Sequence, residues 1–208
     1  MVLPNAWVNE RKREYYYRKA KEENFRSRAS YKLLQAVTKY KFIKPGYVVV
    51  DLGAAPGGWT QAARKLVEDT GFVLAVDLKQ IAPFDESNVR TIIGDISEPQ
   101  TVEEVMEFLP RSVDVVISDV APNVSGIWEL DNARQIDLAQ KSLKVAANVL
   151  RYGGSFFVKV FQGSSTKRFI DEVRRQFSFV KVVKPRASRS KSAEMYVLGM
   201  NYKKKNMR

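Results

Sequence analysis

Runs of apolar residues recur along the chain at regular intervals, and they predict a parallel β-sheet. Five runs are rich in Val, Ile and Phe: 47–53, 72–78, 89–96, 113–120 and 154–161. Nearly continuous apolar runs of this length are typical of strands that are covered on both faces. Segments with helical spacing lie between them, and this alternation predicts an α/β fold with a mostly parallel, doubly wound sheet and helices on both faces.

The clearest helical segment spans roughly 130–150, and we expect Gly153 and Gly154 to end it. Seven apolar residues form its inward stripe: Ala133, Ile136, Ala139, Leu143, Ala146, Ala147 and Leu150. A second helix is predicted over 27–40, with Leu33, Leu34 and Val37 facing inward.

The C-terminal part departs from this rhythm. Two strand-like runs, 179–185 and 195–202, follow each other with no helix between them. Parallel strands would need a longer crossover, so these runs predict a terminal antiparallel pair.

Length and composition favour one domain. A chain of 208 residues that is 45% apolar can bury one core, so we expect a single domain over 1–208, with a basic arm or helix at 1–26 and a basic tail at 203–208. The sequence shows neither an apolar run of membrane-spanning length nor the pattern of a signal peptide. We therefore expect a soluble, cytoplasmic monomer with no membrane partner.

The chain contains no cysteine and no histidine. This excludes disulfides, thiol nucleophiles, zinc sites built from Cys and His, and histidine acid–base chemistry, and we predict no metal site. Any general base must then be Lys, Asp, Glu or Tyr.

The net charge of +12 is concentrated at the two ends of the sequence. Residues 11–28 hold eight Lys or Arg, residues 181–208 hold nine, and the middle of the chain is nearly neutral. This distribution favours a polyanionic partner, RNA or DNA, over an anionic membrane surface. The alternative is that the charge serves only solubility and stability.

The stretch D-L-G-A-A-P-G-G-W, residues 51–59, resembles a dinucleotide-binding loop but has the wrong glycine pattern. In the dinucleotide fingerprint, a second glycine lets the backbone approach a pyrophosphate. Here Ala55 fills that position and Pro56 follows, which disfavours a dinucleotide oxidoreductase. S-adenosylmethionine fits better, because it has an amino-acid end and a nucleoside end but no phosphate.

Three acids follow successive strands and support this interpretation. Asp77 ends the second strand, where a carboxylate can accept hydrogen bonds from both ribose hydroxyls, and Asp95 ends the third, where it can meet the adenine amino group. Asp119 ends the fourth strand. Ligands of open parallel sheets bind at these strand ends.

Lys159 is the unusual residue of the apolar run S-F-F-V-K-V-F. A charged lysine is costly to desolvate there, so it either reaches solvent at the strand end or has a function. Asp119 should end an adjacent strand. Lys32 and Glu194 could converge on the same place from the N-terminal helix and the last strand.

Five motifs in order resemble the FtsJ-type ribosomal RNA 2'-O-methyltransferases. They are R-S-R-A-S-Y-K-L, V-V-D-L-G-A-A-P-G-G-W, S-D-V-A-P-N-V-S-G, G-G-S-F-F-V-K-V-F-Q-G and the R-x-x-S-x-E-x-Y pattern that ends at Tyr196. The resemblance runs from about Arg26 to Tyr202 and implies a Rossmann-like methyltransferase fold. It leaves the stretch Ile127-Trp128-Glu129 and the basic arm without an assigned role.

The resemblance also implies a set of site residues. The catalytic tetrad would be Lys32, Asp119, Lys159 and Glu194. Cofactor contacts would come from Gly53, Gly57, Gly58, Trp59, Asp77, Asp95 and Asp119. The donor would be S-adenosylmethionine, and the acceptor a ribose 2'-hydroxyl, of a uridine, in large-subunit ribosomal RNA or the large ribosomal subunit.

The chemistry suggests a role for each member of the tetrad. A ribose hydroxyl is a poor nucleophile, so a base must take its proton as it attacks in line. Our hypothesis makes Lys159 that base, in its uncharged form, with Lys32 favouring the uncharged form and steadying the developing alkoxide. Asp119 would align base and hydroxyl, and Glu194 would position Lys32.

The basic residues that flank the tetrad in sequence are candidates for binding RNA phosphates: Arg26, Arg28, Arg186, Arg189 and Lys191. Two alternatives remain open. The same tetrad resembles that of transfer-RNA ribose and messenger-RNA cap methyltransferases, and a non-catalytic RNA-binding assembly factor could keep the fold without the activity.

Overall fold

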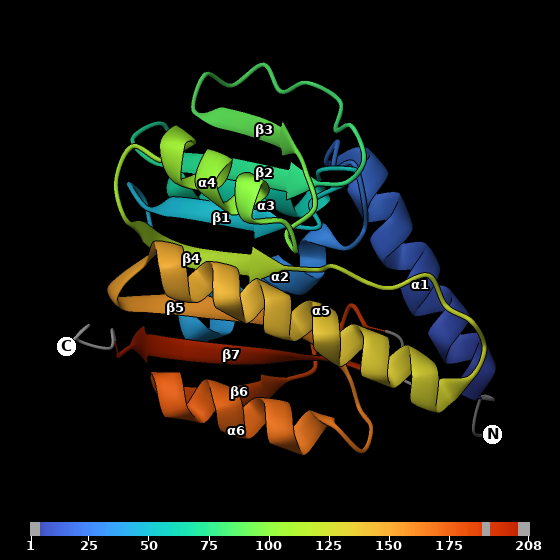
Figure 1. Cartoon of the computed structure of the whole chain (residues 1–208). Coiled ribbons are helices and arrows are strands. Elements are labelled where there is room, and N and C mark those ends of the chain that lie inside the picture. Colours follow the sequence, from blue (N-terminus) through green and yellow to red (C-terminus); the bar gives the residue numbers. More distant parts are fainter. Residues whose placement is uncertain (1–4, 189–191, 204–208) are drawn as a thin grey trace.

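The computed structural model describes residues 5–188 and 192–203, with side chains from Glu14 onward, and it contains one seven-stranded sheet (Figure 1). The strands are β1 (Val48–Leu52), β2 (Phe72–Asp77), β3 (Val89–Ile93), β4 (Val113–Ser118), β5 (Leu150–Phe161), β6 (Phe177–Val183) and β7 (Glu194–Tyr202). The helices are α1 (Asn5–Glu22), α2 (Ser30–Tyr40), α3 (Gly58–Val67), α4 (Pro99–Phe108), α5 (Trp128–Val149) and α6 (Thr166–Gln176).

The strand order is β3-β2-β1-β4-β5-β7-β6. Neighbouring strands from β3 to β5 are parallel, whereas β7 is antiparallel to both β5 and β6. The predicted α/β sheet and the terminal antiparallel pair are confirmed. The last strand inserts between β5 and β6, which places its residues beside those of β5.

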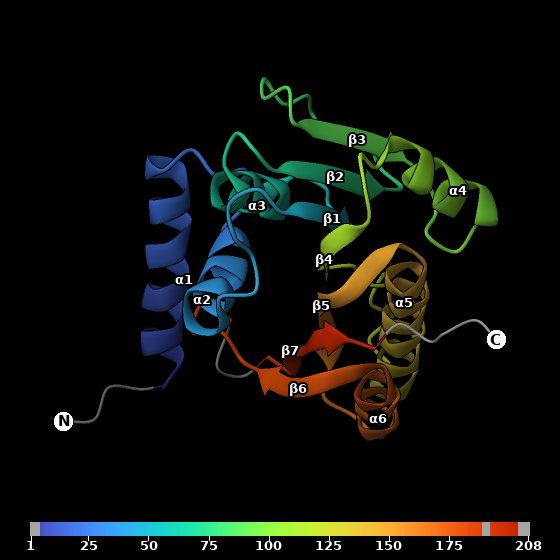
Figure 2. The ribbon, with the colours of Figure 1, turned by 90° about the vertical axis from the view of Figure 1, so that its left-hand side faces the viewer.

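Helices cover both faces of the sheet. α1, α2 and α3 lie on one side, and α4, α5 and α6 lie on the other (Figure 2). Alternate residues of β1 feed the two cores, because Val49 packs on the α2–α3 side while Val48 and Val50 pack on the α5 side. Each fully buried valine or leucine of this kind contributes roughly 1.5–3 kcal/mol relative to an exposed one.

One boundary differs from the sequence prediction. Helix α5 ends at Val149, and β5 begins directly at Leu150, so Leu150 belongs to the strand and the glycines do not end the helix. Gly153 has φ +77, and a Cβ on Gly154 would lie 3.1 Å from the Asp114 carbonyl. The pairing of β4 with β5 shifts register between Val113 and Val115. The two glycines therefore allow an irregularity inside β5.

None of the helices in the described part of the chain is both long and apolar enough to cross a bilayer.

Candidate active site

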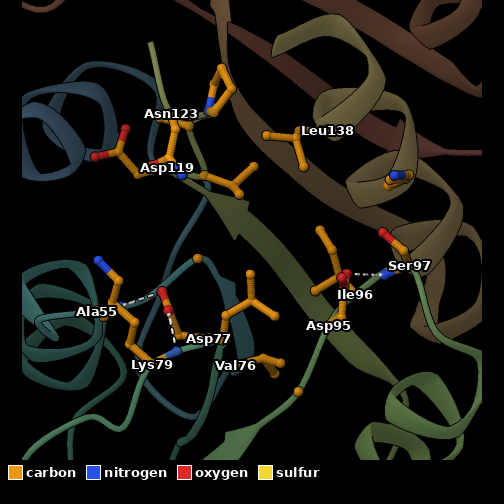
Figure 3. Close-up of a pocket in the computed structure, with 17 residues that line it drawn as sticks. Ala55, Val76, Asp77, Lys79, Asp95, Ile96, Ser97, Asp119, Asn123 and Leu138 are labelled. Carbon is orange, nitrogen blue, oxygen red and sulfur yellow. Dashed lines mark hydrogen bonds between the residues drawn. The ribbon is translucent and has the colours of Figure 1, made fainter. Parts of the chain in front are cut away.

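A pocket of about 510 Å³ lies at the carboxyl ends of β1, β2, β3 and β4 (Figure 3). Its wall includes Gly53 after β1, Asp77 at the end of β2, Asp95 after β3 and Asp119 after β4. The structure therefore brings the three predicted acids together around one cavity. The shared edge of parallel strands explains this, since each strand delivers its next residue to the same place.

Asp77 is held at the pocket wall by two backbone amides. Its Oδ2 accepts a hydrogen bond from the Ala55 amide (2.9 Å), and its Oδ1 accepts one from the Lys79 amide (2.8 Å; Figure 3). Each oxygen retains a lone pair that can accept a ligand hydroxyl. The bond to Ala55 also joins the acid to the 51–59 loop.

Asp95 accepts a hydrogen bond from the Ser97 amide at 2.8 Å. This bond, with a further one from the Ser97 side chain, holds the pKa of Asp95 below its ordinary value. Asp95 is therefore ionised at neutral pH.

Gly53 is required by close packing at the pocket wall. Its φ is +72, and a Cβ there would lie 2.8 Å from Val120, in the segment that follows β4. Only glycine lets the ends of these two strands approach so closely.

The other three predicted cofactor residues lie outside the pocket wall. The ring of Trp59 is buried, stacks on Phe157 at a centroid distance of 5.6 Å and donates a hydrogen bond to the Ala29 carbonyl. A Cβ on Gly58 would collide with Ser27 and Ser30, so this glycine allows α3 to pack closely against the start of α2. Gly57, with φ +105, forms the turn into α3. The structure thus places Gly58 and Trp59 in helix packing and Gly57 in the turn before α3.

The four predicted tetrad residues form two ion pairs, although they come from distant parts of the chain. Lys159 Nζ on β5 donates a hydrogen bond to the Asp119 carbonyl (2.6 Å) and lies 3.3 Å from its Oδ1. Lys32 Nζ on α2 lies 2.6 Å from Glu194 Oε1 at the start of β7. Asp119 belongs both to the first pair and to the pocket wall, so the lysine amine lies beside the pocket.

Tyr196 connects the two pairs, a role that the sequence analysis did not predict. Its hydroxyl lies 2.9 Å from Asp119 Oδ1 and 3.1 Å from Glu194 Oε1. Burial raises the pKa of Tyr196 well above its ordinary value, as do the charges of the two carboxylates, so the hydroxyl keeps its hydrogen. The E-x-Y spacing was the available signal, because alternate residues of a strand share a face.

Glu194 is buried enough that desolvation alone would raise its pKa. The positive charge and hydrogen bond of Lys32, together with the charge of Lys159 and the Tyr196 hydroxyl, outweigh this effect and hold the pKa of Glu194 below its ordinary value. Glu194 is therefore ionised at neutral pH, and Lys32 lies beside a carboxylate.

A match to a family model decides the relationship. The FtsJ-like methyltransferase model covers residues 25–202. The chain belongs to the FtsJ-like methyltransferase family. This confirms the resemblance drawn from the five motifs.

Relatives of this FtsJ-like methyltransferase match nearly its full length. "Ribosomal RNA large subunit methyltransferase E" of Methanothermobacter thermautotrophicus is 49% identical over 203 residues, which is 98% of this chain and 96% of the relative. The protein of the same name from Methanocaldococcus jannaschii is 46% identical over 199 residues, covering 94% of this chain and 81% of the relative. A Plasmodium falciparum crystal structure named as a ribosomal RNA methyltransferase has a TM-score of 0.77 at 26% identity, covering 86% of this chain and 98% of that one.

The FtsJ-like methyltransferase also buries a carboxyl group that the sequence analysis overlooked. Asp51, in the 51–59 loop motif, is 0% exposed, and its Oδ2 accepts a hydrogen bond from Thr60 at 2.7 Å. Its Oδ1 has no hydrogen-bond partner among the residues that the structure describes. Burial raises the pKa of Asp51 to about 7; the nearby Asp119 and Asp77 add to this rise, and Thr60 opposes it.

The predicted RNA-binding residues of this FtsJ-like methyltransferase differ in their burial and in their contacts with the rest of the protein. The guanidinium of Arg26 donates hydrogen bonds to the carbonyls of Ala82 and Pro83 and lies 3.8 Å from the centre of the Phe84 ring. These contacts within the protein use N–H groups of Arg26 that were predicted to bind RNA phosphates. Arg28 is partly buried. Arg189 and Lys191 lie outside the described residues.

Arg186 is exposed on a basic groove. The groove has a volume of about 900 Å³ and lies between α1, α2 and the edge of the sheet at β6. Five cations line it against one acid, Glu23, among the described residues: Lys19, Lys39, Lys181, Lys184 and Arg186. Four tyrosines also line the groove: Tyr15, Tyr16, Tyr31 and Tyr40. Such a surface suits the backbone of a nucleic acid.

Proposed function

We propose that this FtsJ-like methyltransferase transfers the methyl group of S-adenosylmethionine to a ribose 2'-hydroxyl in large-subunit ribosomal RNA. The observation that carries the proposal is the position of Asp119, which lines the pocket and also holds the Lys159 amine. A base fixed beside a donor pocket is what transfer to a hydroxyl needs. The names of the relatives support ribosomal RNA as the acceptor class.

The charges of the pocket fit the cofactor. Three carboxylates, Asp77, Asp95 and Asp119, line it together with two lysines, Lys79 and Lys141. This excess of negative charge disfavours a phosphate and suits a sulfonium ion. Asp77 would hold the ribose diol and Asp95 the adenine end, and the cofactor when bound supplies an electrophilic methyl group.

The protein's own groups then supply orientation and a base. An uncharged Lys159 amine has two hydrogens, which match the carbonyl and the carboxylate oxygen of Asp119. Its lone pair is then free to take the proton of the 2'-hydroxyl as the ribose oxygen bonds to the methyl carbon. The bond between that carbon and sulfur would break at the same time, with its electron pair going to sulfur. Lys32 would steady the developing alkoxide, and Glu194, 2.6 Å from Lys32, would position it.

The exposed cations provide the RNA-binding surface in this proposal. Arg186 and the lysines of the basic groove would contact phosphates on the α1–α2 side of the site. The chain would act as a cytoplasmic monomer.

The test compares wild type with Lys159→Met, which removes the amine and keeps an unbranched side chain. Labelled methyl from S-adenosylmethionine is offered to ribosomal RNA, large subunits and transfer RNA, followed by nucleoside analysis. We expect label in a 2'-O-methyluridine of large-subunit RNA, and a kcat lower by a factor of about 10²–10⁴ in the variant. Cofactor affinity, measured by calorimetry, should stay near that of wild type and serves as the control for folding.

Other outcomes would contradict parts of the proposal. A Lys159→Met enzyme that keeps a large share of the wild-type rate would refute Lys159 as the base. Label only in transfer RNA would replace the acceptor. Tight cofactor binding without transfer to any RNA would favour the non-catalytic alternative.

A further inference from the structure

A patch of large apolar side chains is exposed where the chain leaves β4 and enters α5. Val124 is 73% exposed, Ile127 is 60% exposed and Trp128 is 47% exposed. The nearby Pro122 and Asn123 line the donor pocket, so the patch adjoins its mouth. Neighbouring exposed apolar side chains of this size usually mark a binding surface.

The loop that carries the patch is held in shape by a buried acid. Asp131 is 2% exposed, and its Oδ1 accepts hydrogen bonds from both the amide and the hydroxyl of Ser125, each at 2.8 Å. Its Oδ2 accepts one from the Gly126 amide at 3.1 Å. The apolar side chains are therefore presented by a fixed backbone, and binding to them would not have to order the loop.

Trp128 rests on a second aromatic ring. Its indole stacks on Phe161, with a centroid distance of 6.0 Å and an interplanar angle of 25°. The Phe161 carbonyl accepts hydrogen bonds from Asn132 (3.0 Å) and Thr166 (2.7 Å), which fix the end of β5. The two rings thus form a supported pair, and part of the indole faces solvent.

The strand register places this pair next to the tetrad. Phe161 follows Lys159 by two residues on β5, about 7 Å along the strand, so both side chains leave the same face. Phe161 is paired with Glu194 across β5 and β7, as Lys159 is with Tyr196. The loop after β4 and the start of α5 extend beyond the carboxyl ends of β4 and β5 (Figure 1).

We propose that Trp128, supported by Phe161, stacks on an unpaired base of the RNA next to the acceptor ribose. This inference rests on the proposed function, because it takes the tetrad to receive a ribose. A base attached to that ribose or to its neighbour must lie close to Lys159. Aromatic rings accept any base face, and bases of single-stranded RNA are free to stack on them.

A protein partner fits this patch less well. A protein seated on Trp128 would cover the tetrad side of the pocket, from which the acceptor must reach Lys159. The net charge of +12 and the basic groove between α1, α2 and β6 also favour a polyanion.

The experiment compares Trp128→Ala and Trp128→Phe with Tyr152→Ala. Tyr152 is 75% exposed near the other end of β5, so its variant removes a solvent-facing aromatic ring far from the site. The probes are a short single-stranded RNA of mixed sequence and the same strand annealed to its complement. Binding is measured by titration, and methyl transfer to ribosomal RNA gives KM and kcat.

We expect Trp128→Ala to weaken binding of the single strand, and to raise the KM for ribosomal RNA, by about tenfold. Trp128→Phe should keep most of the affinity, and Tyr152→Ala all of it. Cofactor affinity should stay the same in the three variants. Single-stranded RNA should also quench the Trp fluorescence of wild type more than that of Trp128→Phe, a readout that does not depend on the alanine variant folding.

Equal RNA affinity in wild type and Trp128→Ala, with no difference in quenching, would overturn the proposal. So would concentration-dependent self-association of wild type that Trp128→Ala abolishes, because the patch would then bind another copy of the chain. The two proposals can fail separately. Trp128-dependent RNA binding without any methyl transfer would refute the proposed function alone, and transfer with a KM insensitive to Trp128 would refute this inference alone.

Discussion

The stability of this protein should fall as pH rises from about 5 to about 7, and Asp51→Asn should remove that dependence. Asp51 is fully buried, and its pKa in the folded protein is about 7, whereas an unfolded chain gives an aspartate about 3.9. Because the folded pKa is the higher one, the folded state binds more protons in this window than the unfolded state. The free energy of unfolding therefore decreases with rising pH and levels off above about pH 7.

The magnitude follows from the two pKa values. The full difference is about three pKa units, or about 4 kcal/mol between strongly acidic and alkaline solution. About 2 kcal/mol of this decrease in the free energy of unfolding should occur between about pH 5 and about pH 7. The chain has no histidine, so no side chain has an ordinary pKa within this window. Glu194, Asp95 and Asp114, whose pKa values are lowered, would change the stability only at more acidic pH.

The assay is urea unfolding at constant ionic strength, at several pH values across this window. Wild type should lose about 2 kcal/mol, and Asp51→Asn should show a nearly flat profile, because an amide is always neutral and can still accept the Thr60 hydrogen bond. Asp85→Asn is the matched control, since Asp85 is exposed. Parallel pH profiles for wild type and Asp51→Asn would refute the assignment of the pH dependence to this residue.

Two further predictions concern the ligands. Asp77→Ala should weaken binding of S-adenosylmethionine by about tenfold or more, as measured by calorimetry. The reason is that it removes a carboxylate that the Ala55 and Lys79 amides hold at the pocket wall. Unchanged affinity would argue against this pocket as the donor site. The affinity for RNA should fall steeply as the salt concentration rises. Arg186 is exposed, and Arg186→Ala should reduce the slope of log K against log salt by about 0.7–0.9, the value for one phosphate contact. A flat salt dependence in wild type would contradict phosphate binding.

The sequence predicted the sheet well because its signal is periodic. Continuous apolar runs identified the strands, and the absence of a helix between the last two runs predicted their antiparallel pairing, which β6 and β7 confirm. The boundary between α5 and β5 was wrong, since glycines that could end a helix serve inside β5. A local pattern cannot distinguish these two uses of a Gly-Gly pair.

The candidate site could be predicted only where residues follow strand ends. Asp77, Asp95 and Asp119 lie around one pocket for that reason. The burial of Trp59 and the partners of Arg26 depend on contacts between α2, α3 and the loop after β2, which no spacing along the chain encodes. Tyr196 was missed for a related reason: its role needs not only Glu194, two residues away on β7, but also Asp119, which follows β4.

The insertion of β7 beside β5 is what adds the second half of the candidate active site to the pocket at the strand ends. The parallel strands alone deliver Asp119 and Lys159, whereas Glu194 and Tyr196 arrive with the antiparallel strand. The Tyr196 hydroxyl keeps its hydrogen and lies within hydrogen-bond distance of both Asp119 Oδ1 and Glu194 Oε1. It therefore joins the Lys159–Asp119 pair to the Lys32–Glu194 pair. On the proposed function, the antiparallel strand completes the set of groups that hold Lys159 and Asp119 in place beside the pocket, because without β7 neither Glu194 nor Tyr196 would be there.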